Sequence, residues 1–223
     1  MKNLFKSSTS TIMLLLLAAC GHPADNETGS QLQGYYNSSK LWGHRELRVC
    51  WTDLDQSTAA DRALVQKRIA DTWARHSSLT FVGWDECEIF RDEDINIRVE
   101  DDGSAPHTEG LGTDLSTWGY MSLNFTYQNW GNGTACTQSE AGRKTCIGTN
   151  AIHEFGHALA MAHEHNRSDR DATCIEDQQG TDGDIKIGPF DHDSIMNYCY
   201  SSSYRNRLSQ GDIDTIQAMY GSP

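Results

Sequence analysis

The sequence is short of positive charge, of long apolar runs and of internal repetition. Lys and Arg number 18 against 31 Asp and Glu, which gives a formal net charge of −13 and a pI near 5.0. No run of Lys or Arg forms a patch, so the composition argues against nucleic acid as a partner. We see no internal repeat and no second domain in the 223 residues, a length that suits one domain with a substantial core.

The apolar run near the N-terminus predicts a targeting segment rather than a membrane span. Lys2 and Lys6 precede residues 12–19, a run that is too short to cross a bilayer. It ends in Leu17-Ala18-Ala19-Cys20, which resembles the lipobox of bacterial lipoproteins, where the cysteine is acylated. The alternative is an ordinary secretory signal in which Cys20 is incidental. Removing Cys20 from seven cysteines leaves six, an even set suited to three disulfides in an exported protein.

These patterns divide the chain into three predicted parts. Residues 1–20 form a lipoprotein signal peptide, residues 21–40 a flexible polar tether, and residues 41–223 the folded domain. A lipid on Cys20 would anchor the protein to a membrane of the bacterial cell envelope. The residue after Cys20 is Gly21 and not an aspartate. By resemblance to lipoprotein sorting in enteric bacteria, this favours the outer membrane as the destination. Simple secretion is the alternative.

Alternation and helical periodicity predict a mixed α+β domain. Strand, helix, strand and strand follow one another in the first half, which implies a βαβ crossover feeding a mixed sheet. The helix begins after Ser57 or Thr58 and runs to about His76. The other predicted segments are strands at 46–51, 79–84, 95–99 and 120–125, loops at 101–118 and 127–144, and a closing helix capped by Ser209 and stopped by Gly221.

The stretch between residues 149 and 163 carries the chemical signal. His153 and His157 stand four residues apart, so a helix places both on one face, about 6 Å apart along its axis. Glu154 completes the pattern H-E-x-x-H, in which two neutral histidines hold zinc and the glutamate acts as general base. The alternative is a core helix that happens to carry two histidines.

His163 can join the other two histidines only if the helix ends before it. On a straight helix His163 would lie about 15 Å along the axis from His153, whereas a zinc–nitrogen bond measures about 2.1 Å. The backbone must therefore turn sharply near residue 160, where the sequence has Ala160. An alanine in a left-handed conformation costs roughly 1–2 kcal/mol, which three metal bonds would offset.

Three motifs, in order, resemble the metzincin metalloproteases and, more closely, the astacin family. Residues 153–163 match H-E-x-x-H-x-x-G-x-x-H except that Ala160 replaces the glycine. Residues 163–171 match the extended astacin signature H-E-x-x-R-x-D-R-D, and residues 194–198 match its Met-turn, S-x-M-x-Y. Upstream of residue 145 the similarity is one of pattern only. The resemblance implies a metzincin-like zincin fold, with a mixed twisted sheet, two long helices, and an irregular C-terminal part that holds the Met-turn and a closing helix.

The resemblance also implies a role for each site residue. One Zn²⁺ is held by three neutral imidazoles, those of His153, His157 and His163. Glu154 takes a proton from the zinc-activated water and passes it to the leaving amine, while Tyr198 hydrogen-bonds the oxyanion. Met196 forms an apolar floor beneath the metal, and Glu164 pairs with the mature N-terminus or with groups around the ligands. The strand at 120–125 would form the sheet edge above the cleft, although an interior strand fits its sequence equally well.

The other histidines lack ligand spacing. His165 lies close to the motif and is expected to point away from the site. Ordinary surface or hydrogen-bonding roles are expected for His22, His44, His76, His107 and His192. A cluster of acidic residues hints at a calcium site and consists of Asp177, Asp182 and Asp184. A solvated acidic loop explains it better.

Six cysteines allow fifteen disulfide connectivities, of which we favour one. It pairs Cys50 with Cys87, Cys136 with Cys146 and Cys174 with Cys199.

The sequence therefore predicts a monomeric zinc metalloendopeptidase that acts on proteins or peptides. Two alternatives stay open. One is a non-catalytic surface lipoprotein that keeps a metzincin fold for adhesion or sensing, and the other is a zinc amidase that acts on cell-wall peptides.

Overall fold

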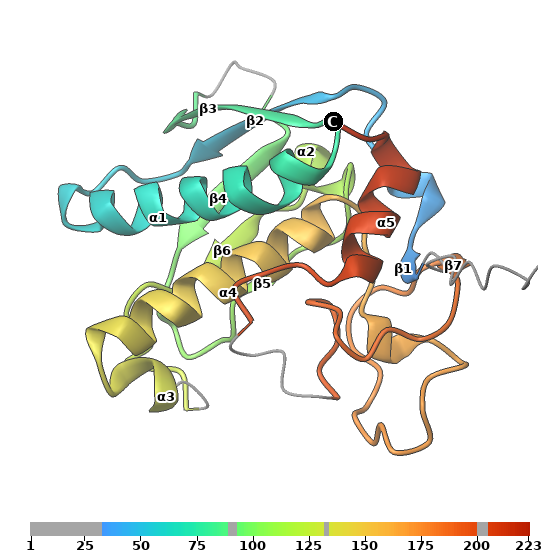
Figure 1. The fold of residues 1–223 in the computed structure, drawn as a ribbon. Helices are drawn as coiled ribbons and strands as arrows, with labels where there is room; N and C mark the ends of the chain where they lie inside the picture. Colours follow the sequence, from blue (N-terminus) through green and yellow to red (C-terminus); the bar gives the residue numbers. More distant parts are fainter. Residues whose placement is uncertain (1–32, 89–92, 132–133, 200–204) are drawn as a thin grey trace, which may run out of the picture. The chain divides into compact units, whose positions relative to one another are not determined.

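A five-stranded sheet with two helices packed on it forms the frame of the molecule (Figure 1). The computed structural model describes residues 33–88, 93–131, 134–199 and 205–223. The strand order is β3-β2-β4-β6-β5, with all neighbours parallel except β5 and β6. The strands are β2 Glu46–Trp51, β3 Thr80–Glu86, β4 Ile95–Val99, β5 His107–Thr108 and β6 Met121–Leu123.

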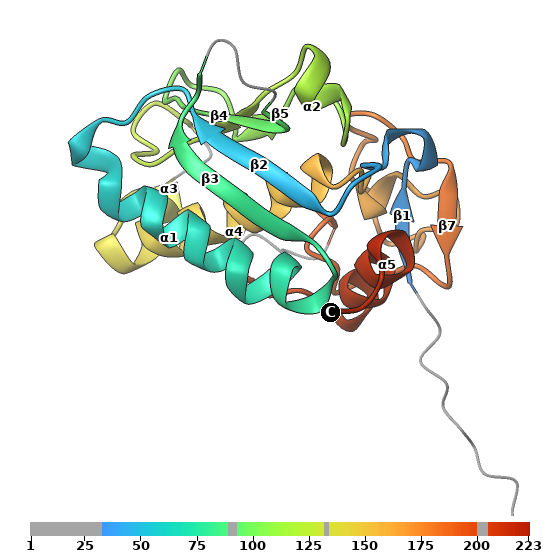
Figure 2. The ribbon, with the colours of Figure 1, turned by 90° about the horizontal axis from the view of Figure 1, so that it is seen from above.

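The two long helices lie side by side on the same face of the sheet, as both views show (Figure 2). They are α1 Ala59–Ile69, which continues as a π-helical turn over Ala70–Ala74, and α4 Glu140–Ala158. Trp73 packs between them with no exposed surface and donates its indole N–H to the carbonyl of Ile152 at 2.9 Å. The predicted βαβ crossover is confirmed, because β2 and β3 are parallel neighbours joined through α1.

Several predicted boundaries need correction. The turn before α1 is capped by Asp55, whose carboxylate accepts from the N–H of Ser57, while Thr58 makes no side-chain cap bond. The predicted loops contain two helices of four residues, α2 Asp114–Thr117 and α3 Thr134–Thr137, and also the start of α4 at Glu140. The strand β6 lies inside the sheet, and the two-residue strand β5 occupies the edge.

The C-terminal part is built around a second, smaller sheet and a closing helix. Strand β1 Gly34–Tyr36 pairs antiparallel with β7 Ile185–Ile187. The helix α5 Gln210–Tyr220 has Ser209 as its N-cap and ends at Gly221, whose φ is 91°, as predicted. The ordered strand β1 contradicts a tether that extends to residue 40. Residues 1–32, with the predicted signal peptide and Cys20, lie outside the described residues.

Three disulfides join Cys50 to Cys87, Cys136 to Cys146 and Cys174 to Cys199, which confirms the favoured connectivity. Within the described ranges, no helix has both the length and the apolar character needed to cross a membrane.

Candidate active site

The end of α4 creates the reversal on which the site depends. Leu159 and Ala160 leave the helix, and Ala160 adopts φ 73°, in the left-handed region. The N–H of Ala160 donates to the His157 carbonyl at 2.8 Å and the N–H of Met161 to the Gly156 carbonyl at 2.9 Å, so the last carbonyls of the helix are satisfied. The chain then turns back over the helix, which confirms the sharp turn predicted at residue 160.

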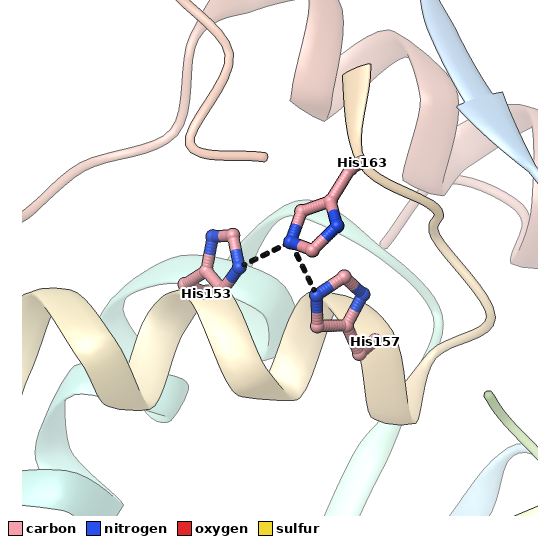
Figure 3. A group of neighbouring side chains, drawn as sticks. All are labelled: His153, His157 and His163. Carbon is pink, nitrogen blue, oxygen red and sulfur yellow. Dashed lines mark hydrogen bonds between the residues drawn. The ribbon is translucent and has the colours of Figure 1, made fainter. Parts of the chain in front are cut away.

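The reversal brings three histidine side chains together (Figure 3). His153 and His157 point from one face of α4, and His163 meets them from the returning chain. The Nε2 atom of His163 lies 3.2 Å from that of His153 and 3.1 Å from that of His157. All three residues are at most 7% exposed. The structure therefore assembles the three histidines that the sequence singles out.

Each imidazole is oriented by a backbone carbonyl. Nδ1 of His153 donates to the carbonyl of Ile195 at 2.8 Å and Nδ1 of His157 to that of Met161 at 2.8 Å. Nδ1 of His163 donates to the carbonyl of Gln179 at 2.9 Å. A carbonyl can only accept, so the proton of each neutral ring resides on Nδ1 and its Nε2 presents a lone pair.

The rings are held in the neutral state that metal binding requires. Burial, followed by the proximity of His163, lowers the pKa of His153 to about 3. Burial also sets the pKa of His157 well below its ordinary value and lowers that of His163. Three buried lone pairs then face one another at close range, an arrangement that repels unless a cation lies among them.

Zinc fits this donor set. Ligands at about 2.1 Å from a tetrahedral ion lie about 3.4 Å from one another, close to the Nε2 separations of 3.1 and 3.2 Å. Three imidazoles leave one coordination position open, which is typical of catalytic zinc sites. Among the described residues, these three form the one group of His, Cys, Asp and Glu side chains that converge in this way.

Glu154 lies one residue after His153 and is 3% exposed. Its Oε2 atom has no hydrogen-bond partner within the described part of the protein. Burial raises the pKa of the Glu154 carboxyl to about 8. A buried carboxylate oxygen that no protein group engages is available to an incoming molecule.

Tyr198 contacts the histidine cluster. Its hydroxyl lies 3.1 Å from Nε2 of His153, and its ring stacks on that imidazole with centroids 5.2 Å apart. The residue is 37% exposed, so it reaches both the histidines and solvent. His165 needs correction here: it is fully buried, and its ring stacks on Tyr198 at 4.9 Å, 4.8 Å from the His163 ring.

The turn that carries Tyr198 is fixed from two sides. Met196 is buried beneath the helix, and a Cβ built on Gly156 would lie 2.4 Å from its sulfur, so a side chain there would displace the Met196 thioether. Asp212 of α5 accepts from the N–H of Ile195 at 2.9 Å and from the hydroxyl of Ser194 at 2.7 Å. The carbonyl that orients His153 is therefore anchored to the closing helix.

Glu164 follows the third histidine but faces away from it. Its carboxylate accepts from the N–H of Asp191 at 2.8 Å and lies 3.3 Å from the guanidinium of Arg167. Arg167 in turn donates to the carbonyls of Gly34 and Ile187, which ties the signature segment to β1 and β7. Glu164 thus pairs with groups behind the site.

Glu154 and Tyr198 line two cavities. The first, of about 360 Å³, includes Trp130, Asn150 and Ile195 in its walls. The second, of about 260 Å³, runs past the edge strand β5 and the segment at Gly180. An extended chain laid along both would cross the histidine cluster.

The remaining predicted residues lie apart from the cluster. His44 is 3.1 Å from Asp94, His107 is 3.7 Å from Glu109, and His192 is 3.8 Å from Asp171. The carboxylates of the acidic loop engage protein groups: Asp182 accepts from Asn166, and Asp184 from Ser38. His22 falls outside the described residues.

The orienting carbonyls of Met161, Gln179 and Ile195 could not be found from the sequence, because any residue type supplies one.

Comparisons with known proteins place the fold. No protein-family model matches the sequence. The astacin-like metalloprotease toxin 2 of Loxosceles intermedia is 32% identical over a stretch that covers 32% of this chain and 42% of that protein. Toxin 4 of Loxosceles laeta is 40% identical over 21% of this chain and 53% of that protein. The chain thus spans about half or less of the length of these relatives.

The structure of myroilysin superimposes with a TM-score of 0.60 at 18% identity, covering 85% of this chain and all of that one. A second myroilysin structure gives a TM-score of 0.54 at 17% identity, covering 86% and 92%. With the mixed sheet and the two long helices, this likeness confirms the predicted α+β, metzincin-like zincin fold.

Proposed function

We propose that this chain is a zinc-dependent endopeptidase that hydrolyses peptide bonds in proteins or peptides. The observation that carries the proposal is the convergence of three neutral imidazoles beside a buried carboxylate oxygen without a partner. The sequence relatives support it, since they are named astacin-like metalloproteases. His153, His157 and His163 would hold one zinc ion, which supplies Lewis-acid polarisation of the scissile carbonyl and acidification of water.

The chain's own residues would move the proton. The free Oε2 atom of Glu154 accepts a proton from the attacking water. The same carboxyl then donates the proton to the departing nitrogen. Tyr198 reaches the histidine cluster through its hydroxyl and can donate to the oxyanion that develops on the carbonyl.

The cleft supports an endopeptidase in particular. Glu154 lines both cavities, whose other walls are largely formed by different residues, so a substrate that occupies both could extend on either side of the cleaved bond. The edge strand β5 lies in the wall of one cavity, and a free strand edge can pair with an extended peptide.

Cleavage of an unstructured protein tests the proposal. Casein or gelatin should be cleaved at internal bonds, chelation should stop cleavage, and added zinc should restore it. Glu154→Gln should keep zinc and lose turnover by roughly two to four orders of magnitude, the range for a general base. Full activity in Glu154→Gln would contradict the assigned base.

The two alternative functions give different results in the same assays. A binding lipoprotein with a metzincin fold would take up zinc without cleaving casein. A cell-wall amidase would release stem peptides from peptidoglycan and leave casein intact. The intact set of three histidines, Glu154 and Tyr198 favours the peptidase over a non-catalytic form.

We also propose that the protein is exported and that Cys20 carries a lipid. Three disulfides support an oxidising compartment. Residues 1–19 would be removed and Cys20, as the new first residue, would be acylated, and the tether would end before β1 at Gly34. Mass spectrometry of the mature N-terminus distinguishes an acylated Cys20 from a secreted chain cleaved elsewhere, and Cys20→Ser should abolish membrane association in the first case.

A further inference from the structure

Asn166 holds the backbone of Gln179 from both sides. Its Nδ2 group donates to the Gln179 carbonyl at 2.8 Å, and its Oδ1 atom accepts from the Gln179 N–H at 3.0 Å. The second hydrogen of Nδ2 is donated to the carboxylate of Asp182 at 2.8 Å. Asn166 is 2% exposed, and both Nδ2 hydrogens and the Oδ1 atom make hydrogen bonds inside the protein.

The carbonyl that Asn166 holds is the one that orients the third histidine. It accepts from Nδ1 of His163 at 2.9 Å. Its position depends on side-chain contacts, since residues 171–184 contain no helix or strand. The backbone carbonyl of Asn166 adds a further contact, because it accepts from the Gln178 side chain at 2.9 Å. The other two orienting carbonyls belong to the turn after α4 and to the turn anchored by Asp212.

We propose that Asn166 is a positioning residue which, through the Gln179 carbonyl, fixes the tautomer and the direction of the His163 ring. The signature H-E-x-x-R leaves this position unspecified, so the sequence pattern gives it no role. With the clamp in place, the His163 proton stays on Nδ1 and Nε2 faces the other two histidines. The expected effect of Asn166 on metal binding rests on the proposed zinc site. Its expected effect on the His163 ring does not.

The test compares three variants of the full chain. Asn166→Ala removes the clamp, and Asn166→Asp keeps the size and the acceptor but loses the donor to the Gln179 carbonyl. Asp184→Ala is the matched control. In the wild type, the N–H and the hydroxyl of Ser38 each donate to one carboxylate oxygen of Asp184 at 2.6 Å. Asp184→Ala removes these two hydrogen bonds of the same loop and leaves the contacts of Gln179 in place. The readouts are the His163 tautomer in the metal-free protein, by nitrogen NMR, and the zinc dissociation constant, by competition with a chelator.

We expect wild type and Asp184→Ala to show His163 protonated on Nδ1 alone. Both Asn166 variants should show mixed tautomers and bind zinc about 10- to 100-fold more weakly, the range for partners of metal-ligating histidines. A single Nδ1 tautomer with unchanged zinc affinity in both Asn166 variants would overturn the proposal. Finding the His163 proton on Nε2 in the wild-type protein would also overturn it, and this result does not depend on whether any variant folds. Because the tautomer is measured without metal, failure of the peptidase proposal leaves this test intact.

Discussion

At the scale of single residues, Ala160 stands where the backbone is most constrained. Its φ of 73° lies in a region that costs an L-residue roughly 1–2 kcal/mol, yet this conformation returns His163 to the cluster. Residue 160 is fully buried, so the alanine methyl group also fills space in the core. The strained conformation of Ala160 lowers the stability of the folded protein, whereas its buried methyl group raises it.

Glycine substitutions separate these effects. Ala160→Gly should change the free energy of unfolding by less than about 1 kcal/mol, because relief of strain offsets the lost methyl group and the added chain entropy. Ala158 is equally buried but is the last residue of α4, so Ala158→Gly should cost about 1–2 kcal/mol. Urea denaturation measures both. A larger loss at residue 160 than at residue 158 would contradict the strain assigned to Ala160.

Glu154 gives the metal-free protein a pH dependence. Its pKa is about 8 in the folded state against an ordinary value of 4.5, so folding favours the protonated carboxyl. Its contribution is fully present below pH 4.5 and is lost as the pH rises through 8. Glu154→Gln cannot ionise, so its stability relative to wild type should increase between pH 5 and 9, by up to roughly 3–5 kcal/mol.

Denaturation of both metal-free proteins across this range measures the difference. The titration of the buried histidines is common to both proteins and cancels in the comparison. A stability difference that stays constant with pH would show that burial does not shift this carboxyl.

At the scale of secondary-structure elements, α5 holds the turn that carries Tyr198. Asp212 accepts from the N–H of Ser209 in a capping box and also from Ser194 and Ile195. The helix end and the site therefore share one buried carboxylate.

Two substitutions at the start of α5 distinguish these roles. Ser209→Ala should lower the free energy of unfolding by about 1 kcal/mol, the usual value of an N-cap. Asp212→Ala should lower it by about 2–4 kcal/mol, since donors at three residues lose their acceptor and two of those hydrogen bonds are buried. Calorimetric unfolding gives both values. Equal losses would mean that Asp212 acts as a helix cap alone.

Elements with strong periodicity were predictable, and those held by tertiary contacts were not. The strands β2 and β4 have the predicted bounds because their alternating side chains enter the core. By contrast, β1 and β5 have three and two residues, and they exist because β7 and β6 offer backbone partners. The sequence predicts a loop where the first turns of α4 lie, because glycines such as Gly142 weaken the signal of a helix that Ser139 caps.

At the scale of the whole molecule, the disulfides close loops of different length. Cys50–Cys87 spans 37 residues and links β2 to the residue after β3, while Cys136–Cys146 spans 10 residues and links α3 to α4. The longer link removes more freedom from the unfolded chain.

Replacing each cysteine pair by alanine tests this difference. The Cys50/Cys87 variant should lose about 4 kcal/mol of unfolding free energy and the Cys136/Cys146 variant about 3 kcal/mol, the values from loop-closure entropy. Guanidinium denaturation under oxidising conditions measures both. The opposite order would show that native contacts, and not chain entropy, set the cost.

The ligands could be predicted because their spacing has a geometric meaning. Two histidines four residues apart must share a helix face, and the third can join only through a reversal, which the structure has at Ala160. The supporting groups could not be predicted, because Asn166 and Gln179 are thirteen residues apart in a segment without periodicity. The stacking of His165 on Tyr198 could not be predicted either, because sequence spacing carries no information on contacts between rings.

X-ray absorption at the zinc edge tests most directly whether His153, His157 and His163 share one ion. For the zinc-loaded chain we predict three imidazole nitrogens at about 2.0–2.1 Å with one or two oxygen ligands, and loss of one imidazole in His163→Ala. A zinc shell containing sulfur, or a spectrum that His163→Ala leaves unchanged, would contradict the account.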